Sequence, residues 1–249
     1  MAELLYGRHP VRESLLAGRR TFHRLLLAQG IEERGIIAEI AALARKAGVA
    51  MQRVLREELD RLGVSHQGLA AEVSPYPYAD WPEMLNLAEE RGEQPLLLLL
   101  DLLQDPQNVG TLLRTAEAVG VHGVILQERR AVGITPAVVS SSAGAVEHLL
   151  VARVTNLVRT MKALQEAGLW LAGLEDLPEA QPYDRVDLNM PLGLVVGSEG
   201  RGMRRLVRER CDLLLRLPMR GRVNSLNASV AGSIALYAAW RQRQRRNHA

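Results

Sequence analysis

The clearest structural signal in the chain lies in residues 191–240, which read PLGLVVGSEGRGMRRLVRERCDLLLRLPMRGRVNSLNASVAGSIALYAAW. The apolar run Leu192–Val196 stops at GSEGRG, residues 197–202, and the apolar run Leu213–Leu217 stops at PMRG, residues 218–221. Each run is typical of a strand that ends in a tight turn. Such strand ends expose main-chain groups at one edge of a sheet, where open α/β folds bind ligands. The stretch therefore predicts a binding site at a sheet edge.

Polar side chains lie in these turns. Glu199 belongs to the first turn, and Ser225 and Asn227 belong to a third, which opens a helical pattern over Ala228–Trp240. We interpret this set of a carboxylate, a hydroxyl and an amide as a site and not merely a core. The many small residues of the last helix predict close packing against a neighbouring element.

Strands and helices alternate from Pro95 onward. Three further strands are predicted, at Leu96–Leu100, Val121–Leu126 and Leu169–Leu174. Helices are predicted at Val109–Val119 and, capped by Thr155, up to Ala167. This alternation predicts an α/β fold with a parallel sheet that helices cover on both faces.

The chain before Pro95 differs in character. Residues 1–73 predict a small α/β unit, with helices at Pro10–Ala17, Ile36–Gly48 and Leu55–Leu62 and strands at Phe22–Ala28, Val49–Val54 and Leu69–Val73. Residues 74–92 contain a proline- and aromatic-rich connector and a short helix, and residues 93–249 form the second domain. The connector's tyrosines are expected to pack against a domain, with stacking on bases as the alternative.

Bulk composition fits a globular protein. The chain has 249 residues, of which 47% are hydrophobic and 24% charged, which does not indicate disorder. The longest leucine run, Leu96–Leu100, is far too short to span a bilayer, and no signal-peptide pattern follows Met1. The single cysteine, Cys211, fits a reducing cytoplasm and is interpreted as a small core residue. Scattered histidines and the lack of a cysteine pair predict no metal site.

The basic residues are nearly all arginine, since lysine occurs only at Lys46 and Lys162. Arginine suits bidentate contacts to phosphate, so this usage fits a nucleic-acid partner, although a compositional bias of the genome explains it equally well. The arginines also cluster near the predicted site and at the end of the chain. Such clustering is the expected footprint of a polyanion.

Three ordered motifs connect these features to a known family. The first is an N-x-G-x₃-R-x₅-G pattern that begins at Asn108, the second is GSEGRG, and the third runs from Leu217-Pro218-Met219 through SLNAS at residues 225–229. Together they resemble the SpoU (TrmH-like) RNA 2′-O-methyltransferases of the SPOUT superfamily. The resemblance spans Pro95 to the C-terminus and, more weakly, the N-terminal part.

The resemblance implies a fold and a cofactor. It implies a C-terminal parallel-sheet domain tied into a trefoil knot, preceded by a small α/β RNA-binding domain, and it implies a homodimer with a composite active site. S-adenosylmethionine is the implied cofactor, held by main-chain groups at Gly197, Leu217 and Leu226. Sequence physics alone would not propose a knot, because knotted chains are very rare.

The resemblance also implies catalytic residues: Asn108, Arg114, Glu199, Ser225 and Asn227. The family mechanism often assigns the matching arginine as general base, but a guanidinium stays protonated in proteins, so we expect Arg114 to act as a fixed cation. Glu199 is then the alternative base, or it orients Arg114 or the target nucleotide. Asn108 and Arg114 are six residues apart and cannot share a helical face. Either Asn108 precedes the helix, or one of the two serves a neighbouring subunit.

Side chains that would contact RNA are predicted in both halves of the chain: Arg8, His9, Arg19, Arg20, Arg201, Arg220 and Arg222. A 2′-hydroxyl nucleophile requires RNA and not DNA. The opening LLYGRHPV, residues 4–11, resembles the subgroup that modifies a guanosine in large-subunit (23S) ribosomal RNA. We therefore expect that substrate, with a tRNA ribose methyltransferase or a non-catalytic RNA-binding paralogue as alternatives.

Overall fold

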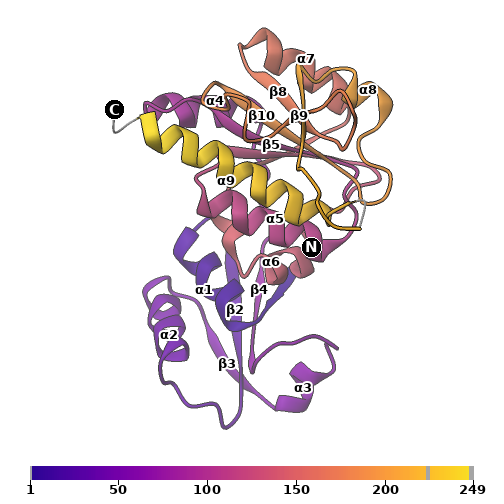
Figure 1. Cartoon of the computed structure of the whole chain (residues 1–249). Helices are drawn as coiled ribbons and strands as arrows, with labels where there is room; N and C mark the ends of the chain where they lie inside the picture. Colours follow the sequence, from indigo (N-terminus) through magenta and orange to yellow (C-terminus); the bar gives the residue numbers. More distant parts are fainter. Residues whose placement is uncertain (1, 223–224, 247–249) are drawn as a thin grey trace. The chain divides into compact units, whose positions relative to one another are not determined.

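The computed structural model describes residues 2–222 and 225–246 (Figure 1). The chain divides into two compact units, one made of Met1–Pro77 with Ile134–His148 and the other of Tyr78–Gly133 with Leu149–Ala249. Within the described residues, no helix combines the length and the apolar character that crossing a membrane requires.

The first unit is built on a four-stranded sheet of order β1-β4-β2-β3. Its strands are β1 (Glu3–Tyr6), β2 (Phe22–Ala28), β3 (Met51–Val54) and β4 (Leu69–Val73). β4 runs antiparallel to both β1 and β2, while β2 and β3 are parallel. The unit is thus a small mixed α/β domain, as predicted.

Five short helices belong to this unit. They are α1 (Arg8–Ala17), α2 (Ile36–Lys46), α3 (Arg56–Asp60), α6 (Pro136–Ser141) and the 3₁₀ helix η1 (Ala145–His148). The predicted apolar stripe of α2 buries Ile37, Ile40 and Ala44. Its spacing of three and four residues puts these side chains on one face of the helix.

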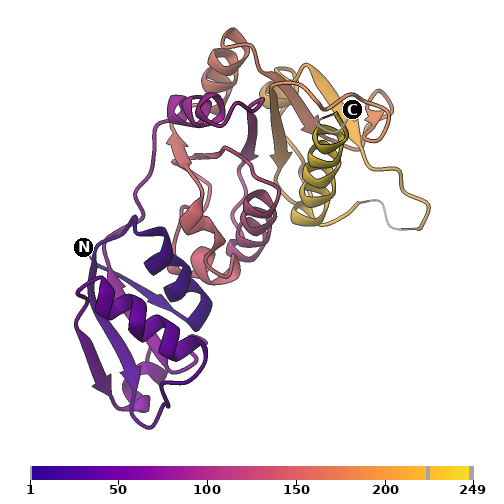
Figure 2. The ribbon, with the colours of Figure 1, turned by 90° about the vertical axis from the view of Figure 1, so that its left-hand side faces the viewer.

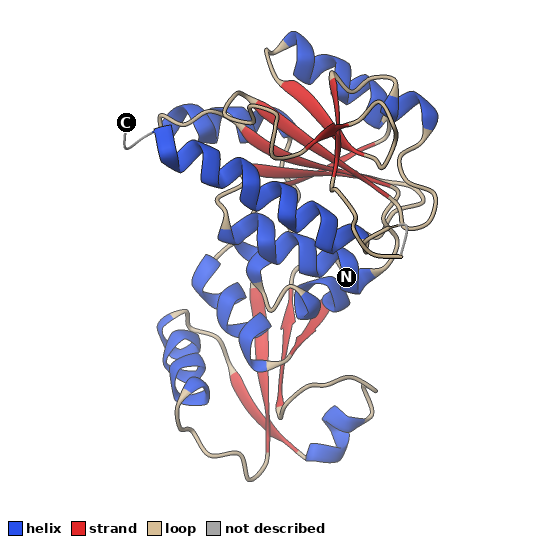
Figure 3. Ribbon diagram, in the orientation of Figure 1, coloured by secondary structure: helices blue, strands red, loops and turns tan. Residues whose placement is uncertain are grey.

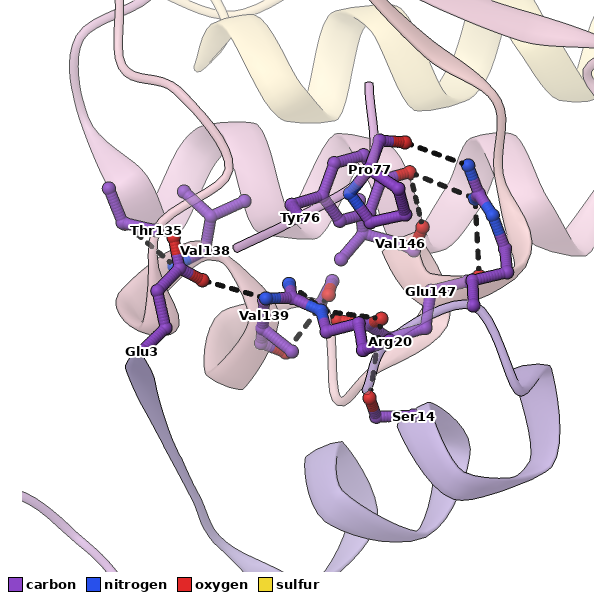
Figure 4. Close-up of polar contacts among 12 residues, drawn as sticks. Glu3, Ser14, Arg20, Tyr76, Pro77, Thr135, Val138, Val139, Val146 and Glu147 are labelled. Carbon is purple, nitrogen blue, oxygen red and sulfur yellow. Dashed lines mark hydrogen bonds and ion pairs between the residues drawn. The ribbon is translucent and has the colours of Figure 1, made fainter. Parts of the chain in front are cut away.

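Buried charges attach Ile134–His148 to the first unit (Figure 4). The guanidinium of Arg20 donates from Nε to Glu147 Oε2 at 3.0 Å, and its Nη2 forms an ion pair with Oε1 at 2.8 Å. Nη1 of Arg20 also binds Glu3 at 2.7 Å. The Tyr76 hydroxyl donates to the Val146 carbonyl at 3.1 Å. The sequence predicted one continuous domain over residues 93–249. In the structure, Ile134–His148 instead belongs to the first unit. This segment could not be assigned from the sequence, because its bonding partners lie far away along the chain.

The second unit holds a seven-stranded sheet of order β7-β6-β5-β10-β8-β11-β9, and every paired neighbour in it is parallel. The strands are β5 (Leu96–Asp101), β6 (Gly123–Gln127), β7 (Val151–Val154), β8 (Trp170–Leu174), β9 (Gln181–Pro182), β10 (Leu192–Gly197) and β11 (Leu213–Arg216). β5 and β10 are fully buried, as expected for apolar strands covered on both faces. The predicted parallel α/β sheet is confirmed.

Helices cover both faces of this sheet (Figure 3). On one face, α4 (Trp81–Glu90), α7 (Leu157–Glu166) and α8 (Arg205–Arg208) bury apolar side chains against the strands. On the other, α5 (Pro106–Ala118) and α9 (Ala228–Arg246) lie side by side (Figures 1 and 2). A Cβ at Gly232 of α9 would lie 2.8 Å from Leu112 of α5 and 3.2 Å from Val196. The small residues of α9 therefore serve close packing within the same chain.

Several sequence expectations need adjustment. The cap of α7 is Asn156, whose side chain accepts from Arg159 N at 3.1 Å, and not Thr155. Strands β1, β7 and β9 were not predicted, and α9 continues past Trp240 to Arg246. In the connector, Tyr76 is buried, which confirms packing against a domain over stacking on bases.

Candidate active site

The site lies where the strand order of the second unit reverses. Chain order runs outward from β5 through β6 and β7, whereas β10 lies on the other side of β5. The carboxyl ends of these neighbours meet, since Asp101 of β5 pairs with Gly197 of β10. Open α/β sheets bind ligands in the crevice outside such a switch point.

The turn after β10 folds back on itself. Ser198 N donates to Gly202 O at 3.1 Å and Gly202 N donates to Ser198 O at 2.9 Å. A Cβ on Gly197 would lie 2.3 Å from the carbonyl carbon of Gly202. Glycine is thus required at this position by the turn itself.

A buried carboxylate at the end of β5 anchors the same turn. Asp101 is fully buried, and its Oδ2 accepts from Arg204 N at 2.8 Å. Its Oδ1 accepts from Arg204 Nε at 2.8 Å and lies 2.7 Å from Nη2. This bidentate contact connects the end of β5 to the segment that follows Gly202. Asp101 was not among the predicted site residues, although an acid that ends an apolar strand is a visible signal in the sequence.

Four polar side chains form a cluster at this edge. Asn108 Nδ2 donates to Glu199 Oε1 at 2.7 Å, and Asn227 Nδ2 donates to the same oxygen at 2.6 Å. Asn227 Nδ2 is also 2.8 Å from Asn108 Oδ1. The hydroxyl of Ser229 lies 3.2 Å from Asn108 Oδ1 and 2.6 Å from Asn227 Oδ1. The structure therefore brings Asn108, Glu199 and Asn227 together and adds Ser229, which the site prediction did not include.

Two helix N-termini hold this cluster in place. Asp105 caps α5 by accepting from Asn108 N at 3.0 Å, which puts Asn108 in the first turn. Asn227 precedes α9, and its Oδ1 accepts from Ser229 N at 2.9 Å and Val230 N at 3.2 Å. Helix N-termini carry partial positive charge and favour a nearby anion. The Glu199 carboxylate thus lies where two helices begin, bound by an amide from each.

A cavity of about 480 Å³ opens beside the cluster. The three predicted cofactor positions, Gly197, Leu217 and Leu226, all line it. The walls also include Ser225, Glu199 and Asn227, together with Glu175 and Asp176, which follow the end of β8. The volume falls within the range of ordinary small-molecule sites. The cavity can therefore hold a ligand in direct contact with the polar cluster.

Arg114 stands apart from the cluster. It is exposed on α5, and none of its contacts in the described part of the chain is a hydrogen bond or ion pair to a cluster member. Because Asn108 is already helical, the option that it precedes the helix is wrong. Six residues separate the two by about 120° around the helix axis. Within one chain, the site therefore contains the Glu199 carboxylate and two amides, whereas Arg114 lies on a different side of α5 from Asn108.

The predicted RNA-contacting residues fall into two groups. Arg20 is buried in its ion pair, so it has no access to RNA. Arg19 donates to the Tyr76 hydroxyl and the Pro77 carbonyl and stacks over the Tyr76 ring, which gives it a structural role. The others are exposed or half-buried: Arg8, His9, Arg201, Arg220 and Arg222. Burial therefore excludes only Arg20 from contact with a polyanion, since Arg19 is itself half-buried.

The structure also bears on the sequence expectations for metal binding and for the single cysteine. No group of three or more metal-binding side chains occurs in the described part of the chain. Burial raises the pKa of Cys211 to about 12, so its thiol stays protonated. An inert thiol in the core matches the sequence interpretation.

Comparison with known proteins agrees with this geometry. The model of the SpoU rRNA Methylase family matches residues 95–237, and a model described as RNA 2′-O ribose methyltransferase substrate binding matches residues 4–79. The TrmH family tRNA/rRNA methyltransferase YacO of Bacillus subtilis is 45% identical over 242 residues, which cover 97% of this chain and 96% of that protein.

Solved structures resemble the chain over different lengths. The SpoU methyltransferase AviRb from Streptomyces viridochromogenes, crystallised with its cofactor AdoMet, is 26% identical with a TM-score of 0.81 and covers 97% of this chain and 90% of its own. A protein solved for the 2-OH methylation of C/U34 on tRNA is 28% identical with a TM-score of 0.55, and covers 61% of this chain and 97% of its own. On its fold, its cluster and these full-length matches, the chain belongs to the SpoU (TrmH) family of RNA methyltransferases.

Proposed function

We propose that this RNA methyltransferase transfers the methyl group of S-adenosylmethionine to a ribose 2′-hydroxyl in large-subunit ribosomal RNA, at a guanosine. The observation that carries the chemistry is the Asn108–Glu199–Asn227 cluster at the edge of the 480 Å³ cavity. A carboxylate held by two amides beside a small-molecule cavity suits a reaction that needs an aligned hydroxyl and a bound donor.

The cavity fits the cofactor that the family uses. Gly197 ends β10, Leu217 follows β11 and Leu226 lies in the loop before α9. We expect the main-chain groups of these three residues to bind an adenine or ribose in the cavity. Glu175 and Asp176 add acceptor oxygens to the same wall. When bound, S-adenosylmethionine supplies an electrophilic methyl group. The protein's own task is then to hold the 2′-hydroxyl and take up its proton.

Glu199 is the group best placed for that proton. Its Oε1 is occupied by two amide donors, and no described residue hydrogen-bonds to its Oε2. We assign Oε2 as the acceptor for the substrate hydroxyl, acting as general base or as the orienting group. Arg114 would then supply a fixed positive charge near the target phosphate.

The position of Arg114 supports a site shared between two copies of the chain. α9 carries exposed apolar side chains on one stripe, Val230, Ile234 and Tyr237, of which Tyr237 is 47% exposed. Arg114 lies near α9, because its neighbour Thr115 is hydrogen-bonded to the hydroxyl of Ser233 at 2.8 Å. We propose that this surface forms a homodimer and that Arg114 serves the partner's cluster. The trefoil knot remains part of the same proposal.

The choice of ribosomal RNA rests on the first unit. The relative that acts on tRNA aligns with only part of this chain, whereas relatives with full-length matches share both units. A substrate-binding family model covers the first unit. Transfer RNA is the second candidate, because YacO is described as a tRNA/rRNA methyltransferase. A cytoplasmic location, where both RNAs occur, belongs to the proposal.

The test supplies labelled S-adenosylmethionine and either unmodified tRNA or a protein-free large-subunit rRNA transcript. We expect faster labelling of the rRNA, and digestion to nucleosides should recover the label in 2′-O-methylguanosine. A Glu199→Gln protein is the control for enzyme-dependent transfer. Faster labelling of tRNA, or label on a base, would contradict the assignment.

A further inference from the structure

A second cavity, of about 800 Å³, lies wholly within the first unit. Its lining comes from three connections of the small sheet: Arg8 and His9 after β1, Gly30 and Ile31 after β2, and Gln67 before β4, with Arg56 at the start of α3. We call this cavity the Arg8 pocket. It is separate from the cluster around Glu199, and nothing in the proposed chemistry uses it.

The rim of the Arg8 pocket is held in an unusual conformation. Gln67 has φ 53°, a left-handed value that non-glycine residues rarely adopt. Its side-chain Oε1 accepts from Arg8 N at 3.1 Å and its carbonyl accepts from Arg8 Nε at 3.3 Å. Strained residues of this kind cluster at ligand sites, where the surrounding structure enforces them.

The buried side chain of His66 holds the loop that contains Gln67. His66 Nδ1 accepts from Gly68 N at 3.0 Å, so Nε2 carries the proton and donates to Asp60 at 2.7 Å. A Cβ on Gly68 would lie 2.8 Å from the Ile31 side chain, which shows how closely the two loops approach. The loop of residues 66–68 is therefore preorganised and does not depend on a ligand for its shape.

Two guanidinium groups without carboxylate partners among the described residues, those of Arg8 and Arg56, line this pocket. Arg8 binds protein only through Nε among its side-chain nitrogens, and in the described part of the chain His9 and Arg56 have no carboxylate partner. One acid, Glu32, is among the lining residues, and its carboxylate lies 3.1 Å from Arg34 in a solvent-exposed pair. Five other arginines of the unit are bound to carboxylates: Arg12, Arg20, Arg24, Arg45 and Arg53. Among the described residues, Arg8 and Arg56 lack the carboxylate partner that each of these five has.

Apolar surface completes the pocket. Ile31 and Ile36 lie among its lining residues, beside the amide of Gln67. An apolar wall, an amide and unpaired guanidinium groups match the three parts of a nucleotide, namely a base face, a base edge and a phosphate. The concave shape suits a base that is splayed out, whereas a duplex presents its bases stacked and paired.

We propose that the Arg8 pocket binds an unpaired nucleotide of the substrate RNA, with Arg8 and Arg56 on its phosphates and its base against Ile31 and Ile36. The proposal rests on the proposed function for the identity of the RNA. It adds the place on the first unit where that RNA is held and the single-stranded state that the pocket selects.

The test compares two arginines of the same short segment. Arg56 lines the pocket, while Arg61, five residues later at the end of α3, is exposed and lies outside it. With full-length protein and the rRNA transcript, Arg56→Ala should raise the KM for RNA about tenfold, the effect of about 1.4 kcal/mol. It should also reduce the salt dependence of binding by about one phosphate contact. Arg61→Ala should change neither quantity by more than about twofold. Equal effects of the two substitutions would refute the pocket.

A binding measurement separates this inference from the proposed function. A fluorescein-labelled single-stranded RNA hexanucleotide should bind the wild-type chain, and an Arg8→Ala/Arg56→Ala protein should bind it at least tenfold more weakly. A blunt RNA duplex of the same sequence should compete poorly. Equal competition by the duplex would overturn the claim for an unpaired nucleotide. If no RNA is methylated and yet the hexanucleotide depends on these arginines, the proposed reaction fails while the pocket stands.

Discussion

Replacing Glu147 by glutamine should destabilise the first unit by about 3 kcal/mol, the lower end of the range for breaking a buried ion pair. Both side chains of the Arg20–Glu147 pair are 0% exposed, so the variant would leave the guanidinium buried with less compensation. Glutamine keeps the shape of the side chain and one acceptor oxygen, and Glu3 still binds Arg20 at 2.7 Å. We therefore do not expect the larger losses of about 5 kcal/mol that breaking a buried pair can cause. Burial alone lowers the pKa of Arg20, but the bonds and charges of Glu147 and Glu3 outweigh it and raise the pKa above its usual value.

The assay is thermal and urea unfolding of the full chain, with thermal unfolding monitored by calorimetry and urea unfolding by far-UV circular dichroism. If the first unit unfolds as a transition of its own, a loss of about 3 kcal/mol corresponds to a fall of roughly 12–24 °C in its Tm. The matched control is Glu72→Gln, which breaks the Arg24–Glu72 pair, where both partners are partly exposed, and should cost less than about 1 kcal/mol. Binding of S-adenosylmethionine should survive in both variants, because the cavity lies in the second unit. If Glu147→Gln behaved like Glu72→Gln, the view that buried charge attaches Ile134–His148 to the first unit would be refuted.

The roles assigned to Glu199, Gly197, Cys211 and His122 can each be tested. Glu199→Gln keeps the acceptor for both amides but removes the charge, so single-turnover methyl transfer should fall by about 10²- to 10³-fold while cofactor binding persists; an unchanged rate would contradict the assigned role. Gly197→Ala should lower both Tm and cofactor affinity, measured by calorimetry, because its Cβ would strike the backbone of Gly202. Cys211, with its pKa raised to about 12, should resist iodoacetamide at pH 8 until urea unfolds the chain. Burial lowers the pKa of His122, so the unfolded state takes up a proton before the folded state as the pH falls below about 6.5. The free energy of unfolding should therefore decline from pH 6.5 toward pH 5, and it should decline less in His122→Gln.

Local signals predicted most of the elements correctly. Strands β2 and β4 have the predicted bounds, since each is an apolar or alternating run between turn residues. The α7 cap was misplaced by one residue because Thr155 and Asn156 are both capping types, and asparagine is the stronger of the two. β7 was missed because its four residues follow a leucine pair with no intervening turn signal. Such errors concern boundaries and short strands, where local patterns carry the least information.

Long-range partners could not be predicted in the same way. Glu147 lies 127 residues from Arg20, and nothing in the small-residue sequence around it indicates which unit it joins. Asn108 and Glu199 are 91 residues apart, and only the parallel order of β5 and β10 brings the ends of their strands together. The motifs predicted that these residues act together, whereas the hydrogen bonds that unite them depend on the tertiary fold.

The charges of the candidate site are not balanced within one chain. Both carboxylate oxygens of Asp101 bind Arg204, and among the described residues Glu199 is hydrogen-bonded only to neutral amides. Within one chain, the cluster therefore carries a carboxylate without a cation bonded to it. A reaction that draws a proton from a hydroxyl next to a phosphate gains most from a positive charge fixed close by. Arg114 has the charge but lies on another side of α5, near the apolar stripe of α9. Pairing two copies through that stripe would bring a cation to a site that otherwise lacks one, so the proposed dimer and the proposed chemistry depend on each other. Mixing an Arg114→Ala chain with a Glu199→Gln chain should therefore restore activity to one site of each mixed dimer, and no recovery above either variant alone would argue against the shared site.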